Sequence, residues 1–251
     1  MNATVQYEIA TIVERPDLRA QLPEIEGQVW PAFMLESEVA SRYWGRLFTE
    51  LGDYQTAFVD EGGTVIAAGM TIPIFWDGDT ATLPEGWDAV LQLGFQQLDS
   101  GVTPNAMSAL SAIIRPGYQG QGLSTEVLRA MRRIGVERGF HSMIAPVRPT
   151  MKSLYPLIPI VQYARWTRHD GLPFDPWMRV HARLGAEVLA PAPHSMHIGG
   201  TVEEWEKWTG LHMPVSGEYV AAGALQPISI NHEAGRGVYY DPNIWVIHQL
   251  D

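Results

Sequence analysis

A glycine-rich segment near the middle of the chain constrains the fold more than any other stretch. It reads Ile113-Ile114-Arg115-Pro116-Gly117-Tyr118-Gln119-Gly120-Gln121-Gly122-Leu123-Ser124. A short apolar run over 109–114 leads into it, and apolar residues at helical spacing follow over 124–138. The segment therefore predicts a strand, a tight turn and the N-terminus of an amphipathic helix. Such an N-terminus favours a phosphate, and Gly120 and Gly122 carry no side chain that would keep it from the backbone.

The rest of the chain mixes strand and helix patterns without an internal repeat, which predicts a mixed α/β or α+β sheet. Residues 152–176 are rich in Pro, Tyr and Trp and show no clean period, so we expect a long ordered insertion that lines a site. The other strands are expected over 5–13, 55–59, 64–73, 106–114, 141–147, 195–198, 218–230 and 238–248, and the other helices over 17–26, 37–51, 83–98, 177–184 and 202–208.

Composition excludes several functional classes. The chain has 251 residues, of which 46% are hydrophobic, which suits a single domain over 1–251 with a substantial core. A formal net charge of −11 argues against a nucleic-acid partner, and the absence of cysteine excludes disulfides, a thiol nucleophile and a thiolate metal site. No apolar run approaches the ~20 residues that cross a bilayer. No basic-then-apolar signal pattern opens the sequence, so we expect no membrane partner and a cytoplasmic location.

The segment Gln119-Gly120-Gln121-Gly122-Leu123-Ser124 resembles the pyrophosphate-binding loop of the GNAT (GCN5-related N-acetyltransferase) superfamily, Gln/Arg-x-x-Gly-x-Gly/Ala, with Ser124 at the final small position. The order of predicted elements is also similar to the GNAT acyltransferase fold, with the insertion before the last core helix. The resemblance implies that the loop and the preceding Ile114 bind coenzyme A or a pantetheine thioester, without a metal. The alternative interpretation of this motif is an ordinary glycine-rich connection between a strand and a helix.

Two residues are candidates for catalysis. In GNAT N-acetyltransferases a tyrosine commonly lies four residues before the glycine of a Leu-Gly-Phe segment; here Leu184-Gly185-Ala186 places His181 at that position. A histidine that titrates near neutrality can donate or accept a proton, although it can also be structural. Thr150 follows the strand that the family splays from its neighbour around the thioester. The resemblance implies that its hydroxyl hydrogen-bonds a thioester oxygen or a substrate carboxylate, and the alternative is a threonine of a turn or helix cap.

Four further segments resemble the GNAT-like domains of polyketide synthase loading modules: 30–34, 147–150, 171–177 and 179–181. Those domains decarboxylate a malonyl-type thioester and load an acyl carrier protein, using a Thr and a His with a Trp and an Arg nearby. The resemblance implies roles for Thr150 and His181. Trp44 or Trp30 would supply the tryptophan, and the arginine is less clear, with Arg183 as one candidate.

This chemistry fits the residues, because losing CO2 leaves an enolate that needs hydrogen-bond donors and a proton. The leading hypothesis is therefore a GNAT-fold enzyme that decarboxylates or transfers an acyl group from coenzyme A or from an acyl carrier protein. Arg129, Arg132 and Arg133 are the expected docking residues for that carrier. A small-molecule N-acetyltransferase using acetyl-CoA and a non-catalytic acyl-CoA-binding protein remain as alternatives.

Overall fold

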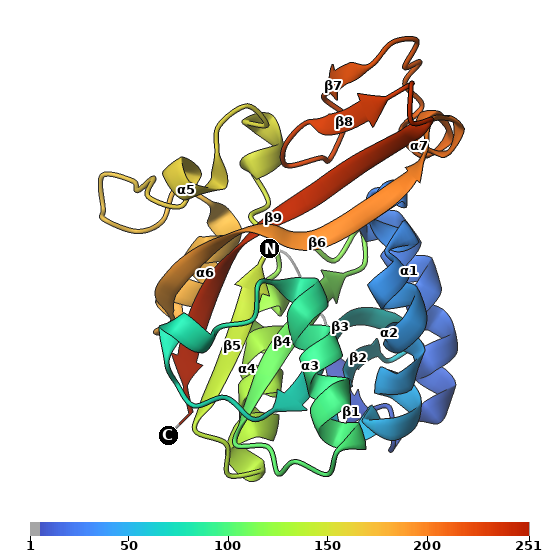
Figure 1. Cartoon of the computed structure of the whole chain (residues 1–251). Helices are drawn as coiled ribbons and strands as arrows, with labels where there is room; N and C mark the ends of the chain where they lie inside the picture. Colours follow the sequence, from blue (N-terminus) through green and yellow to red (C-terminus); the bar gives the residue numbers. More distant parts are fainter. Residues whose placement is uncertain (1–5, 251) are drawn as a thin grey trace.

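A computed structural model describes residues 6–250. These residues form one nine-stranded mixed sheet in the order β1-β2-β3-β4-β5-β9-β8-β7, with β6 paired to β9 (Figure 1). The strands are β1 (Tyr7–Thr11), β2 (Thr56–Asp60), β3 (Val65–Ile74), β4 (Ala106–Ile114), β5 (Ser142–Val147), β6 (Glu187–Thr201), β7 (Gly217–Tyr219), β8 (Ile228–Asn231) and β9 (Arg236–Gln249). The mixed α/β fold class is thus confirmed.

Helices cover both faces of this sheet. They are α1 (Leu22–Val29), α2 (Glu38–Glu50), α3 (Trp87–Asp99), α4 (Leu123–Glu137), α5 (Ile160–Tyr163), α6 (Pro176–Arg183) and α7 (Val202–Thr209). In Figure 1, α3 lies in front of β3 and β4 and α4 lies behind them. The 3₁₀ turns are η1 (Pro16–Gln21), η2 (Ala32–Glu36), η3 (Gly52–Tyr54), η4 (Thr80–Thr82) and η5 (Lys152–Leu154).

The central strand–turn–helix forms as the sequence predicts. β4 ends at Ile114, and α4 begins one residue after Gly122, which serves as the N-cap with a φ of 84°. This left-handed backbone conformation favours glycine. The apolar stripe of α4, which includes Val127 and Met131, packs on β3 and β4 and is fully buried.

Strands β4 and β5 pair in parallel over only three residue pairs, which end at Ser108 and Ile144. Beyond that point β4 continues to Ile114 and β5 to Val147, but the two strands no longer pair with each other. Leu110 is an extra residue in the pairing of β4 with β3, so β4 also carries a bulge at the start of the gap. The two strands therefore diverge on the side of the sheet where the glycine-rich turn lies.

Several sequence-based expectations need correction. The helix expected over 17–26 is the 3₁₀ turn η1 followed by α1, and the strand expected over 218–230 is two strands, β7 and β8, separated by a turn. β6 runs for 15 residues where only 195–198 was predicted, because proline and glycine interrupt its pattern. The strand expected over 5–13 is β1; residue 5 lies outside the described residues.

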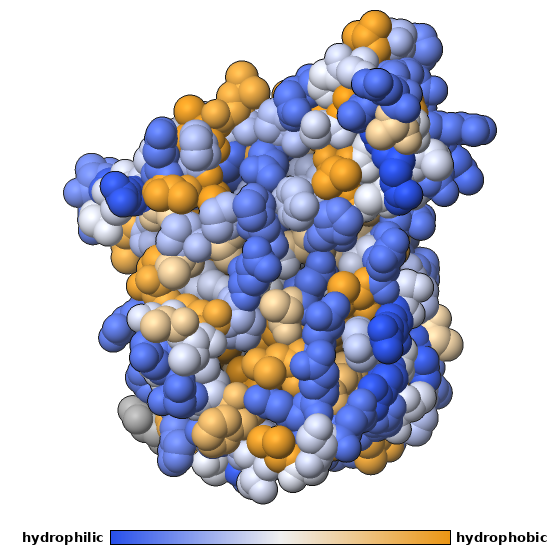
Figure 2. All heavy atoms as spheres, viewed as in Figure 1, coloured by the Kyte–Doolittle hydropathy of each residue, from blue (hydrophilic) through white to orange (hydrophobic). Residues whose placement is uncertain are grey.

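The 152–176 insertion is ordered, as expected, but its aromatic residues form a cluster of their own. Tyr155, Tyr163, Trp166 and Phe174 pack with ring centroids 5.0 to 6.2 Å apart. None of these four residues lines the large cavity described below. Figure 2 shows apolar side chains at the surface over this segment, where Leu154, Leu157 and Val161 are exposed.

Candidate active site

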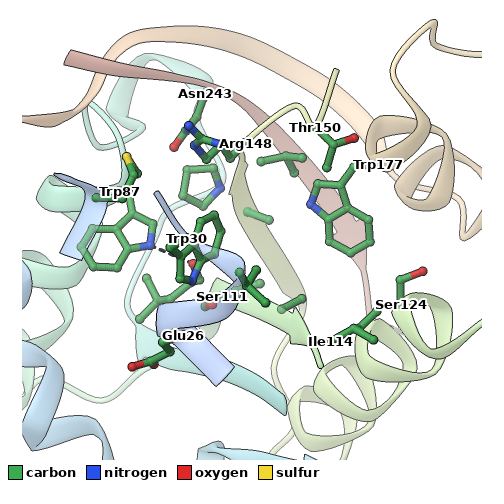
Figure 3. Close-up of a pocket in the computed structure, with 18 of the residues that line it drawn as sticks. Glu26, Trp30, Trp87, Ser111, Ile114, Ser124, Arg148, Thr150, Trp177 and Asn243 are labelled. Carbon is green, nitrogen blue, oxygen red and sulfur yellow. Dashed lines mark hydrogen bonds between the residues drawn. The ribbon is translucent and has the colours of Figure 1, made fainter. Parts of the chain in front are cut away.

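A cavity of about 940 Å³ opens in the gap between β4 and β5 (Figure 3). One wall comes from the ends of these strands, with Ser111 from β4 and Val147 from β5. The turn before α4, the start of α6 and the α1–α2 region complete it, together with residues from β6 and β9. The cavity therefore joins the glycine-rich turn to side chains that are distant in the sequence.

The glycine-rich turn contributes Ile114, Gln119, Gly120 and Ser124 to the cavity lining. The other expected binding residues lie beside it: Leu123 is buried in the core, Gly122 caps α4, and the Gln121 amide donates to the carbonyl of Gly117. A Cβ added at Gly120 or at Gly122 would meet no atom within 4 Å, so both glycines border open space. With the N–H groups of the first turn of α4, this geometry suits a phosphate group.

His181 lines the cavity but is not free to titrate near neutrality. It is 2% exposed, and its Nδ1 lies 2.9 Å from Nε2 of His248 on β9. Burial, together with the neighbouring His248, lowers the pKa of His181 to about 3. A pKa of about 3 leaves the imidazole uncharged at neutral pH, and the catalytic role of His181 stays a prediction.

Two buried polar atoms of the cavity-lining residues have no hydrogen-bond partner within residues 6–250. They are Oγ of Ser111 on β4 and Nε2 of His181 on α6. A buried polar group without a partner is costly, so such atoms commonly mark places where a ligand or water binds. Ser111 was not singled out from the sequence, because an isolated serine in an apolar strand carries no signal of function.

Thr150 also lines the cavity, in the turn after β5. Its hydroxyl lies 3.4 Å from Oδ1 of Asp175, and the same carboxylate accepts hydrogen bonds from the backbone N–H groups of Trp177 and Met178. Asp175 thus caps the N-terminus of α6. Thr150 is consequently fixed next to the start of the helix that carries His181.

Both candidate tryptophans line the cavity, and so do Trp87 and Trp177, which the sequence analysis did not select. Trp44 lies on α2, and its indole Nε1 donates to Oε1 of Glu26 at 3.0 Å. The rings of Trp44 and Trp87 are 5.7 Å apart, and Trp30 lies under the guanidinium of Arg148 at 5.9 Å. The structure therefore does not separate Trp30 from Trp44.

The arginine of the cavity is Arg148, whereas Arg183 is exposed and lies outside the lining. Nε of Arg148 lies 3.0 Å from both carboxylate oxygens of Asp241, which is 1% exposed. Asp241 also accepts from the Tyr239 hydroxyl and from the Asn243 amide. The positive charge of Arg148 is thus already matched by a buried carboxylate.

Glu26 is the other acidic residue of the cavity. It has no ion-pair partner among the described residues, although Trp44 donates one hydrogen bond to it. Burial raises the pKa of the Glu26 carboxyl, and the hydrogen bond from Trp44 opposes that rise. Glu26 is therefore the one acidic residue of the lining without a cationic partner among the described residues, because Arg148 matches Asp241.

The arginines expected to dock a carrier protein have other partners. Arg129 pairs with Glu126 and Arg133 with Glu137, both on α4, while Arg132 donates to the carbonyl oxygens of Leu184 and Gln249.

Within residues 6–250 no group of three or more His, Asp or Glu side chains has a metal-binding arrangement, and no helix there is long and apolar enough to span a membrane.

The chain is similar to known proteins both in sequence and in structure. No protein-family model matches the chain. The arginine N-acetyltransferase AvaD of Aspergillus versicolor is 29% identical over 276 residues, which cover 97% of this chain and 94% of AvaD.

Two solved structures are similar over 98% of this chain. The loading GNATL domain of CurA from Lyngbya majuscula has a TM-score of 0.63 and 17% identity, with 98% of that domain covered. The GphF GNAT-like decarboxylase, solved in complex with isobutyryl-CoA, has a TM-score of 0.57 and 16% identity, with all of that chain covered. The chain therefore has the GNAT acyltransferase fold over nearly its whole length, and its resemblance to the GNAT superfamily is confirmed.

Proposed function

We propose that this protein is an acyltransferase that moves an acyl group from acyl-CoA to an amine. The observation that carries the proposal is one continuous cavity that runs from the glycine-rich turn, through the gap between β4 and β5, to a chamber where the Glu26 carboxyl has no cationic partner among the described residues. The turn suits the pyrophosphate, the gap suits an extended pantetheine arm, and the chamber suits an acceptor. The AvaD relative, described as an N-acetyltransferase, supports the same reaction class.

In this reaction the amine nitrogen attacks the thioester carbonyl, a C–N bond forms, and the C–S bond breaks. The nitrogen loses one proton, and the thiolate of coenzyme A gains one. The negative charge that develops on oxygen and then on sulfur needs hydrogen-bond donors. The hydroxyl of Ser111 and a neutral imidazole at His181 are suited to donate such bonds, because each has a buried polar atom without a partner among residues 6–250.

Decarboxylation of a malonyl-type thioester is the second candidate. It is supported by the presence of Thr150 and His181 in one cavity and by the GphF relative, described as a decarboxylase. The charges of the cavity favour the first candidate, because Arg148 is the one arginine of the lining and is already paired with Asp241, so it is not free to bind a malonyl carboxylate. A carrier-protein donor has less support than free acyl-CoA, since Arg129 and Arg133 pair with neighbouring acids.

The test is a set of parallel incubations followed by mass spectrometry. The protein is mixed with acetyl-CoA and a panel of primary amines that includes arginine, and separately with malonyl-CoA alone. We expect an N-acetylated amine and free coenzyme A from the first mixture and unchanged malonyl-CoA from the second. Loss of CO2 from malonyl-CoA without any amine product would favour the second candidate, and binding of either thioester without turnover would indicate a non-catalytic protein.

A further inference from the structure

We infer that the acceptor carries a second, positively charged group in addition to the nitrogen that is acylated, and that Glu26 binds this group among Trp30, Trp44 and Trp87. The inference rests on the proposed function for the identity of the reaction. It names the acceptor as a bifunctional amine, with a guanidinium or a second ammonium at its far end.

The charge of Glu26 is the first argument. Two other carboxylates near the cavity have a cation: Asp241 pairs with Arg148, and Glu24, outside the lining on α1, pairs with Arg115 at 2.9 Å. Glu26 has only the indole N–H of Trp44, and its partial burial raises its pKa. A nearby cation favours the ionised form of a partly buried carboxyl, so a positively charged ligand would offset the effect of burial on Glu26.

The tryptophan rings are the second argument. Trp30, Trp44 and Trp87 come from three different segments and all line the cavity. An organic cation is attracted to the face of an indole, and Arg148 over Trp30 already shows such a contact in this wall. A flat guanidinium or an alkylammonium next to these rings would bind both to the indole faces and to the carboxylate.

The position of Glu26 within the cavity is the third argument. Figure 3 shows Glu26, Trp30 and Trp87 on one side, Ser124 and Ile114 of the donor end on the other, and Ser111 between them. The attacking nitrogen must be neutral and must reach the thioester, which the proposed function assigns to the strand gap near Ser111. The charge that Glu26 binds therefore belongs to a different group of the same molecule.

The test compares ligands that differ only in charge, in the absence of a thioester. Calorimetry measures the binding of agmatine and of N-carbamoylputrescine, in which an uncharged ureido group replaces the guanidinium, and of arginine and citrulline as a second matched pair. We expect the wild type to prefer the cation of at least one pair by roughly tenfold or more, the usual scale for a hydrogen bond to a charged group. The Glu26→Gln variant should lose that preference, because the amide still accepts from Trp44 but has no charge.

Glu24→Gln is the matched control, since it changes the same residue type on the same helix outside the cavity, and it should keep the preference. Equal binding of the guanidinium and ureido members of both pairs by the wild type would overturn the inference. So would an unchanged preference in a folded Glu26→Gln variant. Charge-selective binding that depends on Glu26, without acylation of any cationic amine, would support the cation site at Glu26 and refute the proposed function.

Discussion

The pair His181–His248 should make the protein lose stability as the pH falls from 7 to 5. Burial is the main cause that lowers the pKa of His181 to about 3 and that of His248 to about 4. In the unfolded chain both have a pKa near ~6.5, so below that pH the unfolded state binds more protons than the folded state. A stabilising contribution that is present above pH ~6.5 is therefore lost as the pH falls toward the folded pKa values.

The magnitude follows from these values. Between pH 7 and pH 5, proton linkage lowers the free energy of unfolding by about 2 kcal/mol for each histidine, or about 4 kcal/mol for the pair. Other groups act in the opposite direction, since burial raises the pKa of Asp88 to about 6. The informative quantity is therefore the difference between the wild type and a variant that lacks both imidazoles.

Urea unfolding at pH 7, 6 and 5 measures this difference. A His181→Gln/His248→Gln variant should lose about 4 kcal/mol less than the wild type over this range, whatever its stability at pH 7. His169→Gln removes an exposed histidine and should behave like the wild type. If the double variant loses as much stability as the wild type, the two imidazoles are not held neutral and the assigned state of His181 is wrong.

Three further outcomes follow from the same structure. Gly122→Val and Gly63→Val both force a branched residue to a positive φ with open space around it, so both should cost roughly 1–2 kcal/mol in urea unfolding, but only Gly122→Val should abolish coenzyme A binding by calorimetry. Arg148→Met should lower the free energy of unfolding by about 3–5 kcal/mol, because it leaves Asp241 buried without its cation; a change below ~1 kcal/mol would contradict this. Ser111→Ala should leave stability unchanged or higher in thermal melts, since its hydroxyl has no partner among residues 6–250, while slowing acyl transfer by about tenfold; an unchanged rate would remove Ser111 from the proposed site.

The end of the cavity at the glycine-rich turn could be predicted because it is built from consecutive residues. The end of the strand, the glycine turn and the start of the helix all lie within 113–124, and each has its own local sequence pattern. The structure confirms the strand as β4 and the helix as α4. His181 and Thr150 were found through a resemblance in their local segments, and the structure brings both to one cavity. Their catalytic roles remain predictions.

The part of the cavity around Glu26 could not be predicted because tertiary packing assembles it. Glu26, Trp87 and Asn243 lie far apart in the sequence, and nothing in their local patterns distinguishes them from helix or strand residues of other proteins. The neutral state of His181 was also missed, since it depends on burial and on His248, 67 residues away. Charge and burial are properties of the packed chain, whereas a glycine turn is a property of the local backbone.

The short pairing of β4 with β5 has a consequence for the resistance of the protein to proteolysis. Only three residue pairs connect β1–β4 to the rest of the sheet, so among the central strands the β4–β5 boundary should open more readily than the longer pairings of β3 with β4 and of β6 with β9. A thioester bound at this boundary would bridge both strands, and at a hundred times its dissociation constant it would stabilise the folded state by about 2.7 kcal/mol. The resistance of the protein to proteolysis would then rise and fall with the supply of its acyl donor.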